Sequence, residues 1–122
     1  MTRVPPRRRT DPEAGRAAVA RVRAAPDPAL DDLRDATRYL LEELAARAPG
    51  RSVEVRVPPY GAVQAVEGPR HTRGTPPNVV ETDPATWVAL AVGTLTWAEA
   101  AATGRLHASG ERADLSPYLP LP

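Results

Sequence analysis

The chain is short, close to neutral and free of cysteine. Its 122 residues are enough for one domain with an ordinary hydrophobic core. The formal net charge is +1, but residues 1–23 carry seven Arg against two acids, whereas the remainder carries nine Arg against thirteen acids. An acidic folded part argues against a dedicated nucleic-acid binder. The absence of Cys excludes disulfides, thiolate nucleophiles and sulfur-ligated metals.

The first 28 residues are predicted to form an Arg- and Pro-rich tail with one short helix, ahead of a single domain over residues 29–122. Asp11-Pro12 is typical of a helix start, and the helix would run to Ala25 before Pro26 ends it. We interpret the basic start as a solvated tail, with contact to an anionic partner as the alternative. The three consecutive arginines are not followed by the apolar stretch of an export signal, so we expect the protein in the cytoplasm.

The strongest helical pattern follows Asp27-Pro28, which is again a start signal. Apolar side chains recur at helical spacing from Leu30 to Ala48 and form one stripe. Acidic residues fall early in this segment and Arg47 falls late, which complements the helix dipole. Pro49-Gly50 ends it.

Four segments are predicted as strands, over residues 52–57, 62–66, 78–82 and 105–109. The first alternates valines with polar side chains without a break, as half-buried strands do. The connections are short, so we expect antiparallel neighbours throughout the sheet. A last turn of helix is predicted within residues 112–119.

Two short apolar helices are predicted between the third and fourth strands. Asp83-Pro84 opens the first, which Gly93 closes, and Thr96-Trp97-Ala98-Glu99 forms a capping box that opens the second. From residue 85 to 102 the only charged residue is Glu99. We nevertheless expect no integral membrane segment, because the glycine and the polar cap break the stretch well short of the roughly 20 residues that span a bilayer.

The first of these helices is apolar almost all round, so it must be covered on every side. A domain this small offers one thin sheet and one long amphipathic helix as cover, and we expect some apolar surface to remain. Such surface on a soluble protein marks a ligand cavity or a partner interface. The residues predicted to line a cavity are Val63, Ala65, Trp87, Leu90, Ala91, Leu95, Trp97 and Leu106.

The same region carries a family resemblance. The run Asp83-Pro84-Ala85-Thr86-Trp87, followed by Leu90, Gly93, Leu95-Thr96, Ala100, Gly104, Leu106 and Gly110, resembles the second half of the sterol carrier protein-2 family, most of all its bacterial subgroup. The resemblance covers about Leu30 to Leu121. It implies an α+β fold in which an antiparallel four- to five-stranded sheet packs against helices and encloses an apolar tunnel for lipids or sterols. The sequence itself shows four strands, so the fifth is not located.

Few residues in the sequence have a spacing that suggests catalysis, metal binding or the binding of a polar group. The loop from Gly68 to Thr75 gathers Arg70, His71 and Arg73, which are candidate contacts for a carboxylate or phosphate head group. The favoured alternative is a solvated loop whose arginines pair with nearby acids. A metal held by His71 with Glu67 and Glu81 is disfavoured, because one His without matching spacing makes a poor site. We expect no metal and no cofactor.

These observations favour a non-enzymatic protein that binds or transfers an apolar, lipid-like ligand, such as a sterol or a fatty-acyl compound. The alternative is a protein-interaction or accessory module that uses the same apolar surface without a lipid. An enzyme built on the Arg70–Arg73 loop is least favoured, because no nucleophile there is paired with a base. We expect a monomer or weak dimer that makes at most transient contact with a membrane or a protein partner.

Overall fold

The computed structural model describes residues 8–69 and 77–121, and it confirms an α+β fold. The elements follow one another in the order α1 (Pro12–Ala24), α2 (Leu30–Arg47), β1 (Val53–Val57), β2 (Gly61–Ala65), β3 (Asn78–Thr82), α3 (Pro84–Val92), α4 (Trp97–Ala102), β4 (Leu106–Ser109) and the 3-10 turn η1 (Ser116–Tyr118). All four predicted strands and the predicted helices are present within a residue or two of their expected limits, apart from the start of α2 and the last turn, which was expected from Arg112 to Leu119 and covers only Ser116–Tyr118.

The four strands form one mixed sheet in the order β2-β1-β3-β4. The β1–β2 and β3–β4 pairs are antiparallel, but β1 and β3 are parallel, with Val55 opposite Val63 on one side and Val80 on the other. The prediction of antiparallel neighbours throughout is therefore wrong for the central pair. Successive strands do reverse direction, but β3 inserts beside β1 and not beside its chain neighbour β2. Because each strand runs opposite to the one before it in the chain, the first and third strands run in the same direction, and β1 and β3 are parallel.

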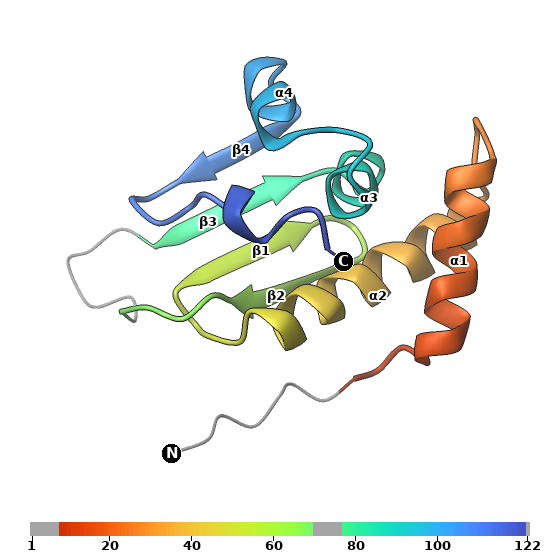
Figure 1. Cartoon of the computed structure of the whole chain (residues 1–122), viewed down its shortest axis with the longest axis horizontal. Coiled ribbons are helices and arrows are strands. Elements are labelled where there is room, and N and C mark those ends of the chain that lie inside the picture. The colour runs from red at the N-terminus through yellow and green to blue at the C-terminus, as the bar shows by residue number, and fades with distance from the viewer. Residues whose placement is uncertain (1–7, 70–76, 122) are drawn as a thin grey trace.

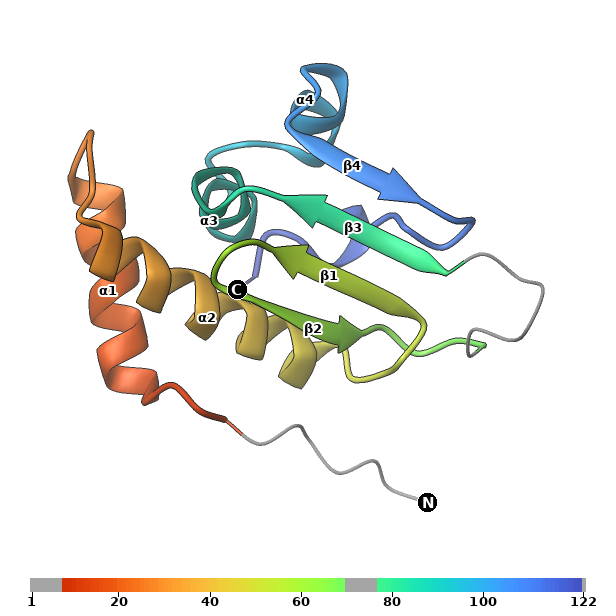
Figure 2. The same ribbon diagram turned by 180° about the vertical axis from the view of Figure 1, so that it is seen from behind.

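The sheet is covered on one face only (Figures 1 and 2). Along β1 the valines are buried while Arg56 is exposed, so the alternation read from the sequence sets the inner and outer faces. Helices α2 and α3 and the segment that contains η1 lie over the inner face. Figure 2 shows the opposite face, which no described helix covers; its exposed side chains include Gln64, Glu81 and His107.

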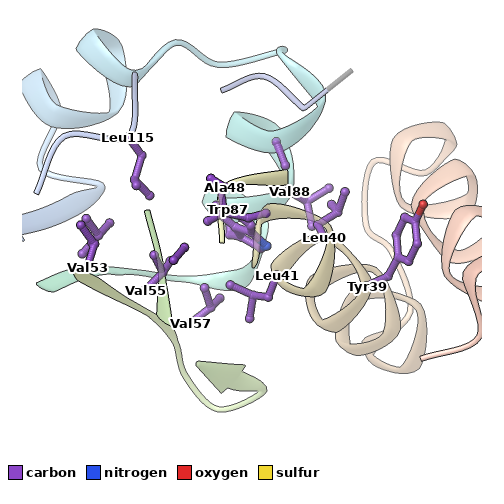
Figure 3. Close-up of a cluster of buried hydrophobic side chains, with 14 of the residues drawn as sticks. Tyr39, Leu40, Leu41, Ala48, Val53, Val55, Val57, Trp87, Val88 and Leu115 are labelled. Carbon is purple, nitrogen blue, oxygen red and sulfur yellow. The ribbon is translucent and has the colours of Figure 1, made fainter. Parts of the chain in front are cut away.

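The main core lies between the inner face and α2, α3 and the C-terminal segment (Figure 3). Trp87 of α3 is 1% exposed, and its indole Nε1 donates a hydrogen bond to the main-chain carbonyl oxygen of Thr37 at 3.3 Å. The valines of β1 point from the sheet into this core, and Leu115 points toward the sheet from the C-terminal segment. A large aromatic side chain thus joins α2 and α3 over the sheet.

The predicted N-terminal helix is present as α1, and it packs against α2 (Figure 1). The Asp11 carboxylate accepts a hydrogen bond from the Ala14 N–H at 3.0 Å, which confirms the expected cap. Ala18 is fully buried, and Gly15 lies against the ring of Tyr39 on α2. This part of the basic N-terminal segment is therefore joined to the core.

The start of α2 was expected at Asp27-Pro28, and this prediction is wrong. The residue at the cap position is Ala29, which makes no side-chain capping bond. The chain is still bent at Pro26 and Asp27, so the aspartate lies ahead of the helix and cannot cap it. The rest of the helix follows its apolar stripe, with Tyr39, Leu40, Leu41 and Leu44 buried.

Candidate functional site

Helix α3 is built as its sequence predicts. The Asp83 carboxylate accepts a hydrogen bond from the Thr86 N–H at 3.3 Å, Pro84 occupies the first turn, and Gly93 ends the helix with a φ of 89°. That left-handed conformation is one that residues with a Cβ avoid, which explains the glycine. The side chains of Trp87, Leu90 and Ala91 are almost fully buried.

The cover of α3 comes partly from a segment that the sequence argument did not assign to it. The N–H of Leu121 donates a hydrogen bond to the carbonyl oxygen of Ala91 at 2.8 Å. In Figure 1 the C-terminal segment crosses the inner face of the sheet beside α3. The helix is therefore hidden more completely than a sheet and one long helix could achieve alone.

Helix α4 starts with the predicted capping box. The Thr96 Oγ1 accepts a hydrogen bond from the Glu99 N–H at 3.1 Å, and the Glu99 carboxylate accepts bonds from the Thr96 hydroxyl at 2.8 Å and the Thr96 N–H at 3.3 Å. These bonds favour the charged carboxylate and hold the pKa of Glu99 below its ordinary value. The helix lies at the β4 side of the sheet, and only Ala100 on it is buried (Figure 1).

A second, smaller apolar cluster lies between these two helices and the last strand. Its members are the buried side chains of Leu90, Ala100 and Leu106, with Leu95, Trp97 and Leu119 partly buried against them. We call this group the α3–α4 cluster. It brings together four of the predicted lining residues, namely Leu90, Leu95, Trp97 and Leu106. Because Leu95 and Trp97 keep part of their surface in contact with solvent, this cluster is less enclosed than the main core.

The other predicted site residues lie elsewhere. Trp87 and Ala91 belong to the main core, and Val63 and Ala65 are on β2. Since β2 and β4 are opposite edges of the sheet, the β2 residues do not join the α3–α4 cluster. The candidate head-group contacts Arg70, His71 and Arg73 fall outside the described residues.

A groove of about 700 Å³ lies at the β2 edge of the sheet, far from the α3–α4 cluster. It is lined by Arg9, Thr10, Ala14, Asp35, Arg38, Leu41, Glu42, Ala45, Tyr60, Gly61, Ala62 and Val63. Half of these residues are polar or charged, which distinguishes the groove from the apolar cavity expected from the sequence. Only Val63 is shared with the predicted lining set. No local pattern could reveal this groove, because its walls come from three separate parts of the chain.

The described residues offer little for metal chemistry or catalysis. Among residues 8–69 and 77–121, no group of three His, Asp or Glu side chains is placed to hold a metal ion. His107 is exposed on β4, on the polar face of the sheet. No helix in the described part of the chain is both long enough and apolar enough to cross a membrane.

These features define a small α+β protein in which one face of a single mixed sheet packs against helices, with a half-open apolar cluster beside its last strand. A family model described as bacterial SCP ortholog matches residues 30–121. The chain therefore belongs to this bacterial sterol carrier protein-like family, and at the level of the family the match suggests a lipid-binding carrier. Comparison with curated proteins found no match.

Proposed function

We propose that the protein binds an apolar, lipid-like ligand, such as a sterol or a fatty-acyl compound, without transforming it, at the α3–α4 cluster. The observation that carries the proposal is that this cluster is apolar, partly exposed at Leu95 and Trp97, and shares only the partly buried Trp97 and Leu119 with the main core. All of its residues fall inside the family match, whose members are carriers at the family level.

The two helices that flank the cluster are held to different degrees. Helix α3 is anchored by Trp87, which is buried and hydrogen-bonded to α2, whereas α4 contributes only Ala100 to the buried interior. A ligand that enters between them can therefore displace α4 while disturbing the main core only at Trp97, which packs against both clusters. Elements with few buried contacts are the ones that open at low free-energy cost.

The free energy gained by burying a hydrocarbon ligand in the cluster is large enough to support binding. Burial of a hydrocarbon chain contributes about 0.8 kcal/mol per CH₂. A ligand with a dozen carbons in the cluster would gain roughly 10 kcal/mol, and after the costs of association a micromolar dissociation constant is the expected scale.

The proposal is tested by titrating the full chain with two fluorescent probes, cis-parinaric acid and dehydroergosterol. The test variant is Leu95→Glu, which puts a charge into the cluster at a partly buried position; we expect at least a tenfold loss of affinity. The matched control is Leu30→Glu, because Leu30 is 72% exposed and lies outside the cluster. Substitution of Ala91 by Trp would be a poorer test, since Ala91 is 1% exposed in the main core and overpacking there would destabilise the fold.

Native mass spectrometry of the protein purified from its own host gives an independent measurement. A co-purified apolar molecule on a monomer supports carriage. A ligand-free, tight dimer by light scattering, with no binding of either probe at micromolar concentration, would reject the proposal and favour the interaction module.

A further inference from the structure

Strand β2 is an edge of the sheet formed by the described residues. It is the first strand in the order β2-β1-β3-β4, and no strand in residues 8–69 and 77–121 pairs with its outer side. Its sequence, Gly61-Ala62-Val63-Gln64-Ala65, contains no charge and no proline. Edge strands of this kind present free N–H and C=O groups to which an extended segment can add, and natural proteins usually guard them.

The groove of about 700 Å³ lies along this edge. Residues 60–63 form one wall, and one side of α2 forms the floor, where Leu41 and Ala45 are 2% and 1% exposed. Helix α2 thus continues beneath the position that a further strand beside β2 would occupy. We call this groove the β2 slot.

The far wall of the β2 slot comes from Arg9, Thr10 and Ala14, ahead of the family match that begins at residue 30. The wall is tied to α2 by Glu42, whose carboxylate accepts hydrogen bonds from the N–H of Arg9 at 2.7 Å and of Thr10 at 3.0 Å. This wall therefore lies outside the part of the chain that the family model matches.

The hydrogen bonds within the β2 slot indicate whether a bound ligand should carry a positive or a negative charge. Its two carboxylates are already engaged, Asp35 by the Arg34 Nε at 2.9 Å and Glu42 by the wall. The Arg38 Nε donates to the carbonyl oxygen of Tyr60 at 2.9 Å, while its terminal nitrogens make no hydrogen bond to the described residues. A guanidinium held by one nitrogen beside the start of β2 is suited to bind a carboxylate through the others.

We propose that the β2 slot binds an extended peptide of a partner protein, which adds to the sheet antiparallel to β2 and carries an acidic residue near its C-terminal end. Alternate side chains of that peptide would face α2, and those between them would face the open side of the sheet. The C-terminal end of an antiparallel strand lies beside the start of β2, where Arg38 would bind the acidic side chain.

Other occupants fit less well. The chain's own segments over residues 1–7 and 70–76 carry four arginines and no acidic residue, so Arg38 and Arg9 would repel them. A second copy would have to bring a whole sheet against a groove that Arg9, Thr10 and Ala14 also line, whereas a peptide brings a single strand. The β2 slot is at the sheet edge opposite the α3–α4 cluster, so peptide binding and lipid carriage are separable.

The experiment selects a phage-displayed random heptapeptide library against the full chain and measures synthetic copies of the enriched sequences by fluorescence anisotropy. We expect the enriched sequences to carry Asp or Glu near the C-terminal end, and we expect chemical-shift changes at the amides of residues 61–65. Arg38→Glu should weaken binding at least tenfold. The matched control Arg56→Glu reverses an exposed charge on β1, on the uncovered face of the sheet, and should leave affinity unchanged.

A version of the peptide with N-methylated alternate amides separates main-chain pairing from simple charge attraction, and it should also bind at least tenfold more weakly. If Arg38→Glu lowers the unfolding midpoint, Arg38→Gln replaces it. The proposal is overturned if no sequence is enriched, if binding is indifferent to Arg38 or to N-methylation, or if the β2 amides are found paired with residues 1–7, residues 70–76 or a second copy.

Discussion

The indole Nε1 of Trp87 lies 3.3 Å from the carbonyl oxygen of Thr37, fifty positions earlier in the chain. Both residues are almost fully buried, and the hydrogen bond ties α3 to the middle of α2. This contact satisfies the only polar atom of the tryptophan side chain. It also fixes α3 firmly, which leaves α4 as the helix able to move when the α3–α4 cluster opens.

The Thr37 side chain suggests a stabilising substitution. Its Oγ1 is buried and has no hydrogen-bond partner among the described residues. Valine has nearly the same shape without the hydroxyl, so Thr37→Val should raise the free energy of unfolding by about 1 kcal/mol, measured by urea denaturation. The control is Thr82→Val, because the Thr82 hydroxyl donates to the Arg105 carbonyl oxygen at 2.7 Å; this change should cost about 1 kcal/mol. A loss of stability in Thr37→Val would contradict the prediction.

A substitution at Gly15 tests how tightly α1 packs against α2. A Cβ on this residue would overlap the Tyr39 side chain near its root, where it cannot swing away. Helix propensity alone favours alanine over glycine by about 1 kcal/mol. We nevertheless expect Gly15→Ala to lower stability, by about 1–3 kcal/mol, because overpacking opposes the gain. Hydrogen exchange should become faster in α1 than in the sheet. The opposite change at an exposed position of α1, Ala17→Gly, serves as the control and should lower stability only by the difference in helix propensity. A Gly15→Ala protein that is more stable than the parent would disprove the tight contact with Tyr39.

Glu43 should make stability depend on pH in the acid range. Burial by itself would raise the pKa of Glu43, but hydrogen bonds from Arg8 and Arg47 outweigh it and hold the pKa below its ordinary value. A carboxyl with a lowered pKa in the folded state contributes stability above its unfolded pKa, and this contribution is lost as the pH falls through the folded pKa.

We therefore expect Glu43→Gln to be less stable than the parent at pH 7 and to differ less from it below about pH 4, near the ordinary pKa of a glutamate. Urea midpoints at several pH values measure this. Glu111→Gln, at an exposed position, serves as the control. An unchanged gap between parent and Glu43→Gln across this range would show that the ion pairs do not titrate as described.

The capping box of α4 should be a local weak point. Removal of the Thr96 hydroxyl in Thr96→Ala deletes the bond from the Glu99 N–H, which typically costs about 1 kcal/mol. Because α4 buries only Ala100, we expect faster hydrogen exchange over residues 97–102 with little change in the main core. Asp83→Ala removes the cap of the firmly packed α3 instead, and its effect should spread to the global unfolding transition. Equal local and global effects in both variants would refute the difference in anchoring.

Much of the secondary structure was readable from the sequence because its signals are local. Asp11, Asp83 and Thr96 each accept the capping bond that their position predicted, and the valines of β1 face inward as their alternation required. The spacing of Gly, Leu and Trp after Asp83 was also enough to indicate the family. These features depend on residues a few positions apart, so they can be recognised in the sequence without knowledge of the tertiary structure.

Only the tertiary structure decided which distant segments meet. It placed β3 beside β1, separated Val63 and Ala65 from the α3–α4 cluster, and set residues 9–14 opposite β2. Strand neighbours and helix contacts are chosen by the total burial of apolar surface over the whole chain, and many pairings satisfy the same local pattern. The sequence by itself therefore determined the elements and the class of protein, whereas the position of its grooves and clusters followed from packing.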